Sequence, residues 1–157
     1  LRTEPNDINT LGNYGISLKG LAKLKQDEIL FTNSCKQFEK ILAIEPSHVM
    51  SLQYYGLSLT ELAQLKNDEG LFNKALEQHK KVLEIQPYET YNIACCYAVM
   101  GQKEIAKENL LIAEEHNTIP PIAYLSSDSD LDNIRTEQWF IKLLARLKDK
   151  EQKVKVA

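Results

Sequence analysis

Apolar residues recur at helical spacing along most of the chain. An i, i+3, i+4 pattern, typical of an amphipathic helix, is formed by Leu18, Leu21, Ala22 and Leu24. After a short polar interruption a second such stripe is formed by Phe31, Ser34, Cys35, Phe38, Ile41 and Leu42. Glycines and prolines fall mostly near the expected helix ends, and strand or hairpin signals are few. The pattern therefore predicts an all-α chain.

The two stripes are repeated further along the chain. Residues 14–46 align without a gap on residues 55–87, and 17 of the 33 aligned pairs are identical. The identical pairs include tyrosine, glycine, aspartate, phenylalanine and proline positions, whereas chance similarity between helices shares only periodicity. We therefore infer an internal duplication, in which each unit is a pair of helices. Pro46 and Pro87 end the second helices, because proline disfavours the helical conformation of the residue before it.

Polar residues at fixed places predict where the helices begin. Asn6 or Asp7 is expected to cap the first helix, and Ser47 the helix that follows Pro46. The acidic pairs 27–28 and 68–69 recur with the duplication and invite an acid/base interpretation. We interpret them instead as the starts of the second helices, where negative charge interacts favourably with the helix dipole.

A shorter third unit follows at residues 91–115. Its small and apolar positions are Ala94, Tyr97, Gly101, Ala106, Leu110 and Ala113. With these residues the chain resembles the tetratricopeptide repeat (TPR) family over about residues 8–115. The resemblance implies an all-α, TPR-like α-solenoid of antiparallel helix hairpins, wound as a right-handed superhelix. The expected organisation is a single domain over residues 1–157, with repeats at 7–46, 47–87 and 88–116, a C-terminal cap at 117–148 and a frayed tail at 149–157.

The chain departs from the family pattern in three ways. The first two units are 41 residues long, seven more than the family's 34, with the additional residues near positions 25–28 and 66–69. Seven residues make nearly two helical turns with a phase error of about 20°, so the longer hairpin keeps its apolar stripe in register. The third unit begins early and has a short first helix, and Leu18 and Leu59 stand where the family has tyrosine. The cap is expected as an extended break at Pro120-Pro121, a polar loop at 126–130 that supplies an N-cap, and a helix from about Leu131 to Lys148.

The resemblance also implies a concave groove lined by the first helix of each hairpin. The expected peptide-binding residues are Asn13, Ile16, Met50, Gln53, Tyr54, Leu57, Glu61, Tyr91, Asn92 and Cys95. Further positions on the same face are Gly12, Lys19, Gly20, Thr60, Ala98 and Val99. Asparagine both donates to and accepts from a peptide backbone, and the apolar members are of the kind found at interface centres. The alternative is that these side chains pack under the cap or a neighbouring helix.

Composition and charge narrow the classes of partner. The net charge of −3 offers no basic surface for nucleic acid, and no apolar run approaches the length of a membrane span. Three cysteines, two of them adjacent, make a poor disulfide framework and suggest a reducing compartment. We therefore expect a soluble intracellular protein, in a cytoplasm or an organelle stroma. The first residue is Leu1 rather than methionine, so we also expect that the chain begins inside a longer precursor.

Candidate chemistry is sparse. The three histidines, His48, His79 and His116, lack the spacing of a metal site, and His79 is expected to be a packing residue. Cys95 and Cys96 point about 100° apart on a helix and have no local base to activate a thiolate, so both are interpreted as buried apolar residues. Phosphate loops, nucleophile elbows and dinucleotide fingerprints are absent from the sequence. We expect neither an enzyme nor a cofactor or metal.

The expected function is therefore that of a scaffold, an adaptor or an assembly factor, which binds a peptide or helix of another protein in its groove. The chaperone-binding branch of the family holds a C-terminal carboxylate with a clamp that includes Lys and Arg. Here the matching places carry Gly12, Ile16, Tyr54 and Asn92, so the sequence gives no support for a chaperone tail as ligand. The alternative function is a self-associating structural scaffold, because nothing obvious covers the first unit ahead of Asp7 and copies can stack end to end.

Overall fold

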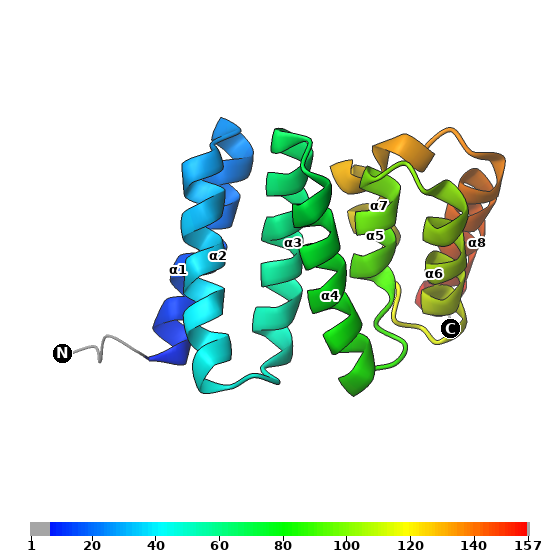
Figure 1. The fold of residues 1–157 in the computed structure, drawn as a ribbon. Coiled ribbons are helices and arrows are strands. Elements are labelled where there is room, and N and C mark those ends of the chain that lie inside the picture. Colours follow the sequence, from blue (N-terminus) through cyan, green and yellow to red (C-terminus); the bar gives the residue numbers. More distant parts are fainter. Residues whose placement is uncertain (1–6, 157) are drawn as a thin grey trace. The chain divides into compact units, whose positions relative to one another are not determined.

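The computed structural model describes residues 7–156, with side chains through Val154. All regular structure within this range is helical, which confirms the all-α prediction. The chain divides into two compact units, residues 1–87 and 88–157. In each of them consecutive helices pack pairwise, as a helical repeat requires (Figure 1).

The first unit contains the two duplicated hairpins. Its helices are α1 (Ile8–Lys25), α2 (Glu28–Ile44), α3 (Val49–Lys66) and α4 (Glu69–Ile85). α1 pairs with α2, α3 pairs with α4, and α2 packs against α3 to join the hairpins (Figure 1). The helices have 18, 17, 18 and 17 residues, so the two hairpins match in length as the 41-residue duplication predicts.

The helix boundaries follow the polar residues. Asp7 caps α1 by accepting a hydrogen bond from the Thr10 amide at 2.7 Å, while the other expected cap, Asn6, lies outside the described residues. Asp27 and Asp68 cap α2 and α4, which confirms that the acidic pairs begin these helices. The expected cap Ser47 is wrong by one position. His48 caps α3, because its Nδ1 lies 3.3 Å from the Ser51 amide as acceptor.

Both hairpins turn at a residue in the left-handed conformation. Gln26 ends α1 with φ 52°, and Asn67 occupies the same place after α3 with φ 51°. Neither is glycine, but each is followed at once by the aspartate that caps the next helix. Two residues therefore separate the helices of each hairpin, and the seven additional residues of each unit lengthen the helices rather than a loop.

Within each hairpin a glycine of the first helix packs against an aromatic ring of the second helix. A Cβ on Gly15 would lie 2.8 Å from Phe38 Cζ, and one on Gly56 would lie 2.5 Å from His79 Cε1. A side chain at either glycine would clash with the ring, so each helix packs closely against its partner at this position. The Ser34 hydroxyl bridges the hairpins by donating to the Gly15 carbonyl at 2.8 Å and lying 3.0 Å from Ser58 Oγ.

The apolar stripes are buried unequally. Most of the expected α2 and α4 stripe positions are buried, and so are Leu18 and Ala22 of α1. Leu21 and Leu24, expected in the same stripe, are instead 41% and 85% exposed. Both lie on a side of α1 that no described helix covers, whereas the equivalent Leu62 of α3 packs with Phe31 of α2.

The second unit contains a shorter hairpin and the cap. Its elements are α5 (Tyr91–Val99), α6 (Lys103–Glu115), α7 (Ile122–Ser127), the 3₁₀ helix η1 (Ser129–Ile134) and α8 (Gln138–Val156). α5 has nine residues, half the length of α1, as the shortened third repeat predicts. Gly101 has a φ of 75° and ends the hairpin turn, a conformation that glycine adopts without strain. The core is centred on fully buried residues, namely Leu110, Leu125, Leu131, Ile134, Phe140 and Leu143.

The cap differs from the prediction in its details. The expected helix start at Leu131 is wrong, because 129–134 forms η1 and α8 begins at Gln138. Asp128 caps η1 through the Asp130 amide at 3.1 Å, and the Arg135 guanidinium donates to the Ser126 and Asp128 carbonyls, which together hold the chain in a tight turn. At the other end α8 continues past the expected end at Lys148 as far as Val156. An exposed i, i+4 ion pair, Lys153 to Asp149 at 2.8 Å, lies in this extension.

Candidate functional site

The predicted groove face of the first unit contains a hollow between α1 and α3. The hollow has a volume of about 140 Å³. Its lining residues are Ile8, Asn9, Gly12, Asn13, Ile16, Phe38, His48, Met50 and Ser51. Asn13, Ile16 and Met50 belong to the set that the repeat register placed in the groove. The duplication therefore brings together, on two helices, three residues that lie up to 37 positions apart in the sequence.

The floor of the hollow is aromatic. Phe38 of α2 is buried and reaches the hollow because Gly15 leaves no side chain in its way. Tyr54 of α3 stacks on Phe38 with ring centroids 5.9 Å apart and an interplanar angle of 14°. Tyr54 is not itself a lining residue, but its stacking supports the Phe38 ring, so an incoming side chain meets a floor that is already ordered.

The rim of the hollow is polar. Asn9 and Asn13 of α1 are exposed, one turn apart on the same helix. Across from them His48 is fixed by its contacts with Ser51, which include a 2.8 Å hydrogen bond between Nδ1 and the Ser51 hydroxyl. Amide groups beside an apolar floor are suited to a peptide, because they bond its backbone while the floor receives a side chain.

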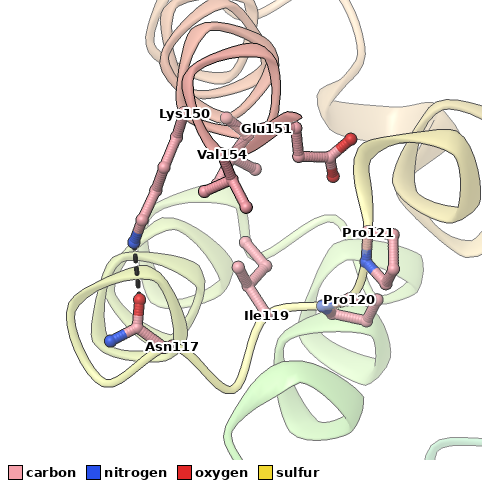
Figure 2. A pocket seen from close by; sticks show the side chains of 8 residues that line it. Asn117, Ile119, Pro120, Pro121, Lys150, Glu151 and Val154 are labelled. Atoms are coloured by element: carbon pink, nitrogen blue, oxygen red, sulfur yellow. Dashed lines mark hydrogen bonds between the residues drawn. The ribbon is translucent and has the colours of Figure 1, made fainter. Parts of the chain in front are cut away.

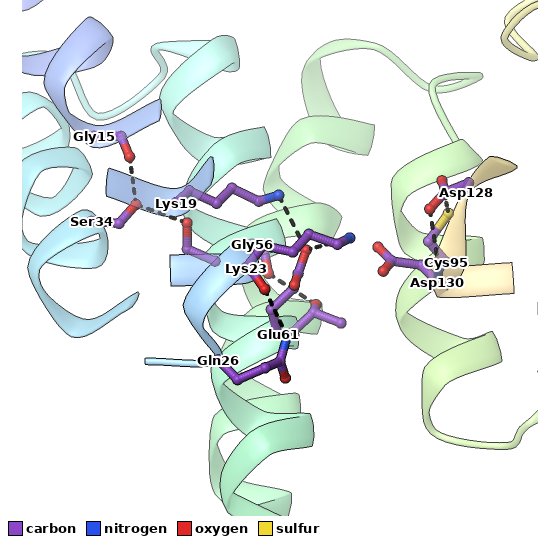
Figure 3. Close-up of polar contacts among 12 residues, drawn as sticks. Gly15, Lys19, Lys23, Gln26, Ser34, Gly56, Glu61, Cys95, Asp128 and Asp130 are labelled. Carbon is purple, nitrogen blue, oxygen red and sulfur yellow. Dashed lines mark hydrogen bonds and ion pairs between the residues drawn. The ribbon is translucent and has the colours of Figure 1, made fainter. Parts of the chain in front are cut away.

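A cluster of charged side chains lies farther along the same face of α1 and α3, toward the C-terminal ends of these helices. The Glu61 carboxylate of α3 accepts from Lys19 Nζ at 3.2 Å and from Lys23 Nζ at 2.9 Å, as Figure 3 shows. The Glu61 side chain is only 9% exposed, so α1 and α3 are joined here by an ion pair largely shielded from water. Glu61, predicted as a groove residue, therefore fastens the two helices and fixes their separation at this end.

The remaining predicted residues of the first unit lie on the same helices with different accessibility. Gln53, Tyr54 and Leu57 are half-buried on α3. Thr60 is buried and donates its hydroxyl to the Gly56 carbonyl at 2.9 Å. Gly20 of α1 is exposed with open space around it.

In the second unit the predicted groove residues lie under the cap. Tyr91 and Cys95 are 5% and 1% exposed. The Tyr91 hydroxyl donates to Asp128 Oδ2 at 2.6 Å, and Cys95 Sγ lies 3.8 Å from the same oxygen. Only Asn92 of the three is partly accessible. The cap therefore covers this stretch of α5, which was the alternative interpretation of these residues.

Burial also fixes the chemistry of Cys95. Desolvation, together with the nearby Asp128 and Asp130 carboxylates, raises the pKa of the Cys95 thiol well above its usual value. Burial likewise raises the pKa of the Tyr91 hydroxyl, and Cys95 and Asp128 add to the effect. Both groups are therefore protonated at neutral pH, and the thiol lacks the thiolate character that a nucleophile requires.

Sequence reasoning missed a larger hollow in the second unit. It has a volume of about 430 Å³ and lies between the Pro120-Pro121 break and the end of α8 (Figure 2). Ile119, Leu147 and Val154 contribute apolar surface, and Lys150 closes one side by donating to Asn117 Oδ1 at 2.5 Å. The hollow was missed because the expected cap helix ended at Lys148, before Val154.

A third hollow lies between α2, α3 and α4. It measures about 410 Å³ and is lined by Tyr55, Glu39 and Lys74 among others. The Tyr55 hydroxyl donates to Glu39, and Lys74 Nζ lies 3.2 Å from the same carboxylate. Burial raises the pKa of the Tyr55 hydroxyl, and Glu39 adds to the effect. With its polar groups already engaged with one another, this hollow offers less to a ligand than the one between α1 and α3.

No group of three or more His, Cys, Asp or Glu side chains suited to a metal ion occurs among the described residues. Within the same range no helix has both the length and the apolar character needed to cross a bilayer. Comparison with known proteins finds no matching family model, no matching curated protein and no matching solved structure.

Proposed function

We propose that the chain is a TPR-like interaction scaffold that binds a peptide segment of another protein on the face formed by α1 and α3. The observation that carries the proposal is the hollow between these helices, which combines an apolar floor with a rim of amides. Its volume of about 140 Å³ suits one side chain rather than a whole segment. The ligand is therefore an extended peptide with a single apolar anchor, held along its backbone by Asn9 and Asn13.

The rigidity of the face supports this role. The Glu61 ion pairs join α1 to α3. Ser34 of α2 contacts the Gly15 carbonyl of α1 and the Ser58 hydroxyl of α3, and so links α2 to both helices. A preorganised surface loses little conformational entropy on binding, so a small contact area suffices for measurable affinity. The absence of a basic clamp at Gly12 and Ile16 favours an internal peptide segment over a C-terminal carboxylate.

The test is the selection of binding peptides from a displayed random library on the full chain, followed by affinity measurements on variants. Ile16→Lys and Met50→Lys place a charge in the hollow and should each weaken the selected peptides at least tenfold. Ile44→Lys is the matched control, since Ile44 and Met50 are 52% and 54% exposed but Ile44 lies outside the hollow. Helicity by circular dichroism should be unchanged in all three variants. Equal affinities for Met50→Lys and Ile44→Lys would refute the site.

A further inference from the structure

An exposed strip runs along α1 on a side that the described helices leave uncovered. We call it the open face of α1, and it consists of Tyr14, Ser17, Leu21 and Leu24. These residues recur every three, four or seven positions and so share one side of the helix. Tyr14 is 54% exposed, and Leu21 and Leu24 are 41% and 85% exposed. A strip of large apolar side chains that no described helix covers is a packing surface without a partner among the described residues.

The same four residues occur 41 positions later on α3. Tyr55, Ser58, Leu62 and Leu65 repeat the open face without a change of residue type. On α3 the tyrosine is 4% exposed and the first leucine 6%, and the serine is fully buried. The same four residue types therefore occur twice in the first unit, covered by a neighbouring helix on α3 and exposed on α1. The covered copy shows which chemistry fits the uncovered one.

The cover of the α3 copy is helix α2, which meets it with three side chains. Tyr55 donates its hydroxyl to the Glu39 carboxylate. Ser58 Oγ lies 3.0 Å from Ser34 Oγ. Leu62 packs with Phe31 in a buried apolar cluster, against which Leu65 also packs. On α1, by contrast, the Ser17 hydroxyl donates within its own helix, to the Asn13 carbonyl at 2.8 Å.

We propose that the open face of α1 binds an amphipathic helix of a partner chain that carries the α2 pattern. That pattern is an aromatic residue, a hydroxyl residue three positions later and a carboxylate eight positions after the aromatic, as in Phe31, Ser34 and Glu39. Spacings of three and eight place all three groups on one side of a helix. The carboxylate accepts from Tyr14, the hydroxyl meets Ser17, and the aromatic ring covers Leu21 and Leu24.

A second copy of this chain does not supply such a helix. Its own α2 already covers α3, and α4 carries Ala75 and Lys80 at the places of Ser34 and Glu39. A lysine opposite Tyr14 offers no acceptor for the hydroxyl. Among the other described helices none combines the three residue types at these spacings. The pattern therefore points to a different polypeptide segment as the occupant.

The probe is a fluorescent peptide with the sequence of residues 27–46, titrated with the full chain and followed by anisotropy. A hydrocarbon staple between its positions 36 and 40, which are exposed in α2, holds it helical and removes the cost of folding on binding. We expect saturable binding that Leu21→Lys weakens at least tenfold. Leu111→Lys is the matched control with unchanged affinity, because Leu111 of α6 is 38% exposed against 41% for Leu21.

A double-mutant cycle tests the register of the complex. Tyr14→Phe in the chain and Glu39→Gln in the peptide should each weaken binding several-fold, and together no more than the stronger of the two alone, because they remove the same hydrogen bond. Absent binding, or binding that Leu21→Lys leaves intact, overturns the proposal, and independent effects in the cycle overturn the register. If the chain alone self-associates and Leu21→Lys abolishes that association, the occupant is a second copy and the proposal is also overturned. The open face is distinct from the groove hollow, so Leu21→Lys should leave groove peptides bound.

Discussion

His79 should make the stability of the first unit sensitive to acid. The side chain is fully buried, its ring lies against Gly56, and its Nε2 has no hydrogen-bond partner among the described residues. Burial lowers its pKa from 6.5 to about 4 in the folded chain. The unfolded chain therefore binds a proton more readily than the folded chain between these two values. The stability that a neutral His79 provides is complete above pH 6.5 and is lost as the pH falls toward 4.

The magnitude follows from the size of the pKa shift. Each unit corresponds to about 1.4 kcal/mol, so the shift to about 4 represents roughly 3 kcal/mol in total. Between pH 7.0 and 4.5 the loss of unfolding free energy that comes from His79 alone should be roughly 2 kcal/mol. Other groups titrate in the same range, so a variant is needed to isolate this contribution.

His79→Phe provides that isolation. Phe38 occupies the corresponding place beside Gly15, so the variant copies a pairing that the first hairpin already contains. Urea unfolding of both proteins at pH 7.0 and 4.5 gives four free energies. We expect the wild type to lose about 2 kcal/mol more than the variant over this interval. Parallel losses in the two proteins would refute the assignment of acid sensitivity to His79.

Two further predictions test the packing. Gly56→Ala should lower the free energy of unfolding by about 1–3 kcal/mol, because its Cβ would lie 2.5 Å from His79 Cε1. Gly20→Ala, which has open space around it, should instead raise the free energy of unfolding by up to about 1 kcal/mol. Thermal unfolding measures both variants, and equal effects would contradict the close approach at Gly56. Asp128→Ala should lower the free energy of unfolding by about 1–3 kcal/mol, because it leaves the Tyr91 hydroxyl without its acceptor and η1 without its N-cap. It should also speed the labelling of Cys95 by a thiol reagent, measured by mass spectrometry of the Cys95 peptide. An unchanged labelling rate would show that Asp128 does not hold the cap over α5.

The helix pairs could be predicted because local signals agreed with one another. The aspartates at 27 and 68 indicate where the second helices begin, the prolines at 46 and 87 indicate where they end, and both signals recur with the duplication. The cap was harder to predict, because its turn depends on Arg135 reaching the Ser126 and Asp128 carbonyls. Such a contact joins residues through space and leaves no periodic trace in the sequence.

The candidate site could be predicted only in part. The register of the resembled family predicted one face for Asn13, Ile16 and Met50, because helix geometry fixes which positions share a side and the repeat pairs α1 with α3. The burial of Tyr91 and Cys95 depends on where the cap folds, which register does not reveal. The exposure of Leu21 also escaped prediction, because Leu21 and its identical equivalent Leu62 have different neighbours.

The most direct test of the proposed groove is a nuclear magnetic resonance titration of the ¹⁵N-labelled chain with a library-selected peptide. The account predicts that the backbone amide signals of Gly12, Asn13 and Ile16 on α1, and of Met50 and Tyr54 on α3, shift most. Those of Glu39 and Lys74 in the hollow between α2, α3 and α4 should shift little. Shifts that centre on Glu39 and Lys74, or on the hollow beside Pro120-Pro121, would contradict it.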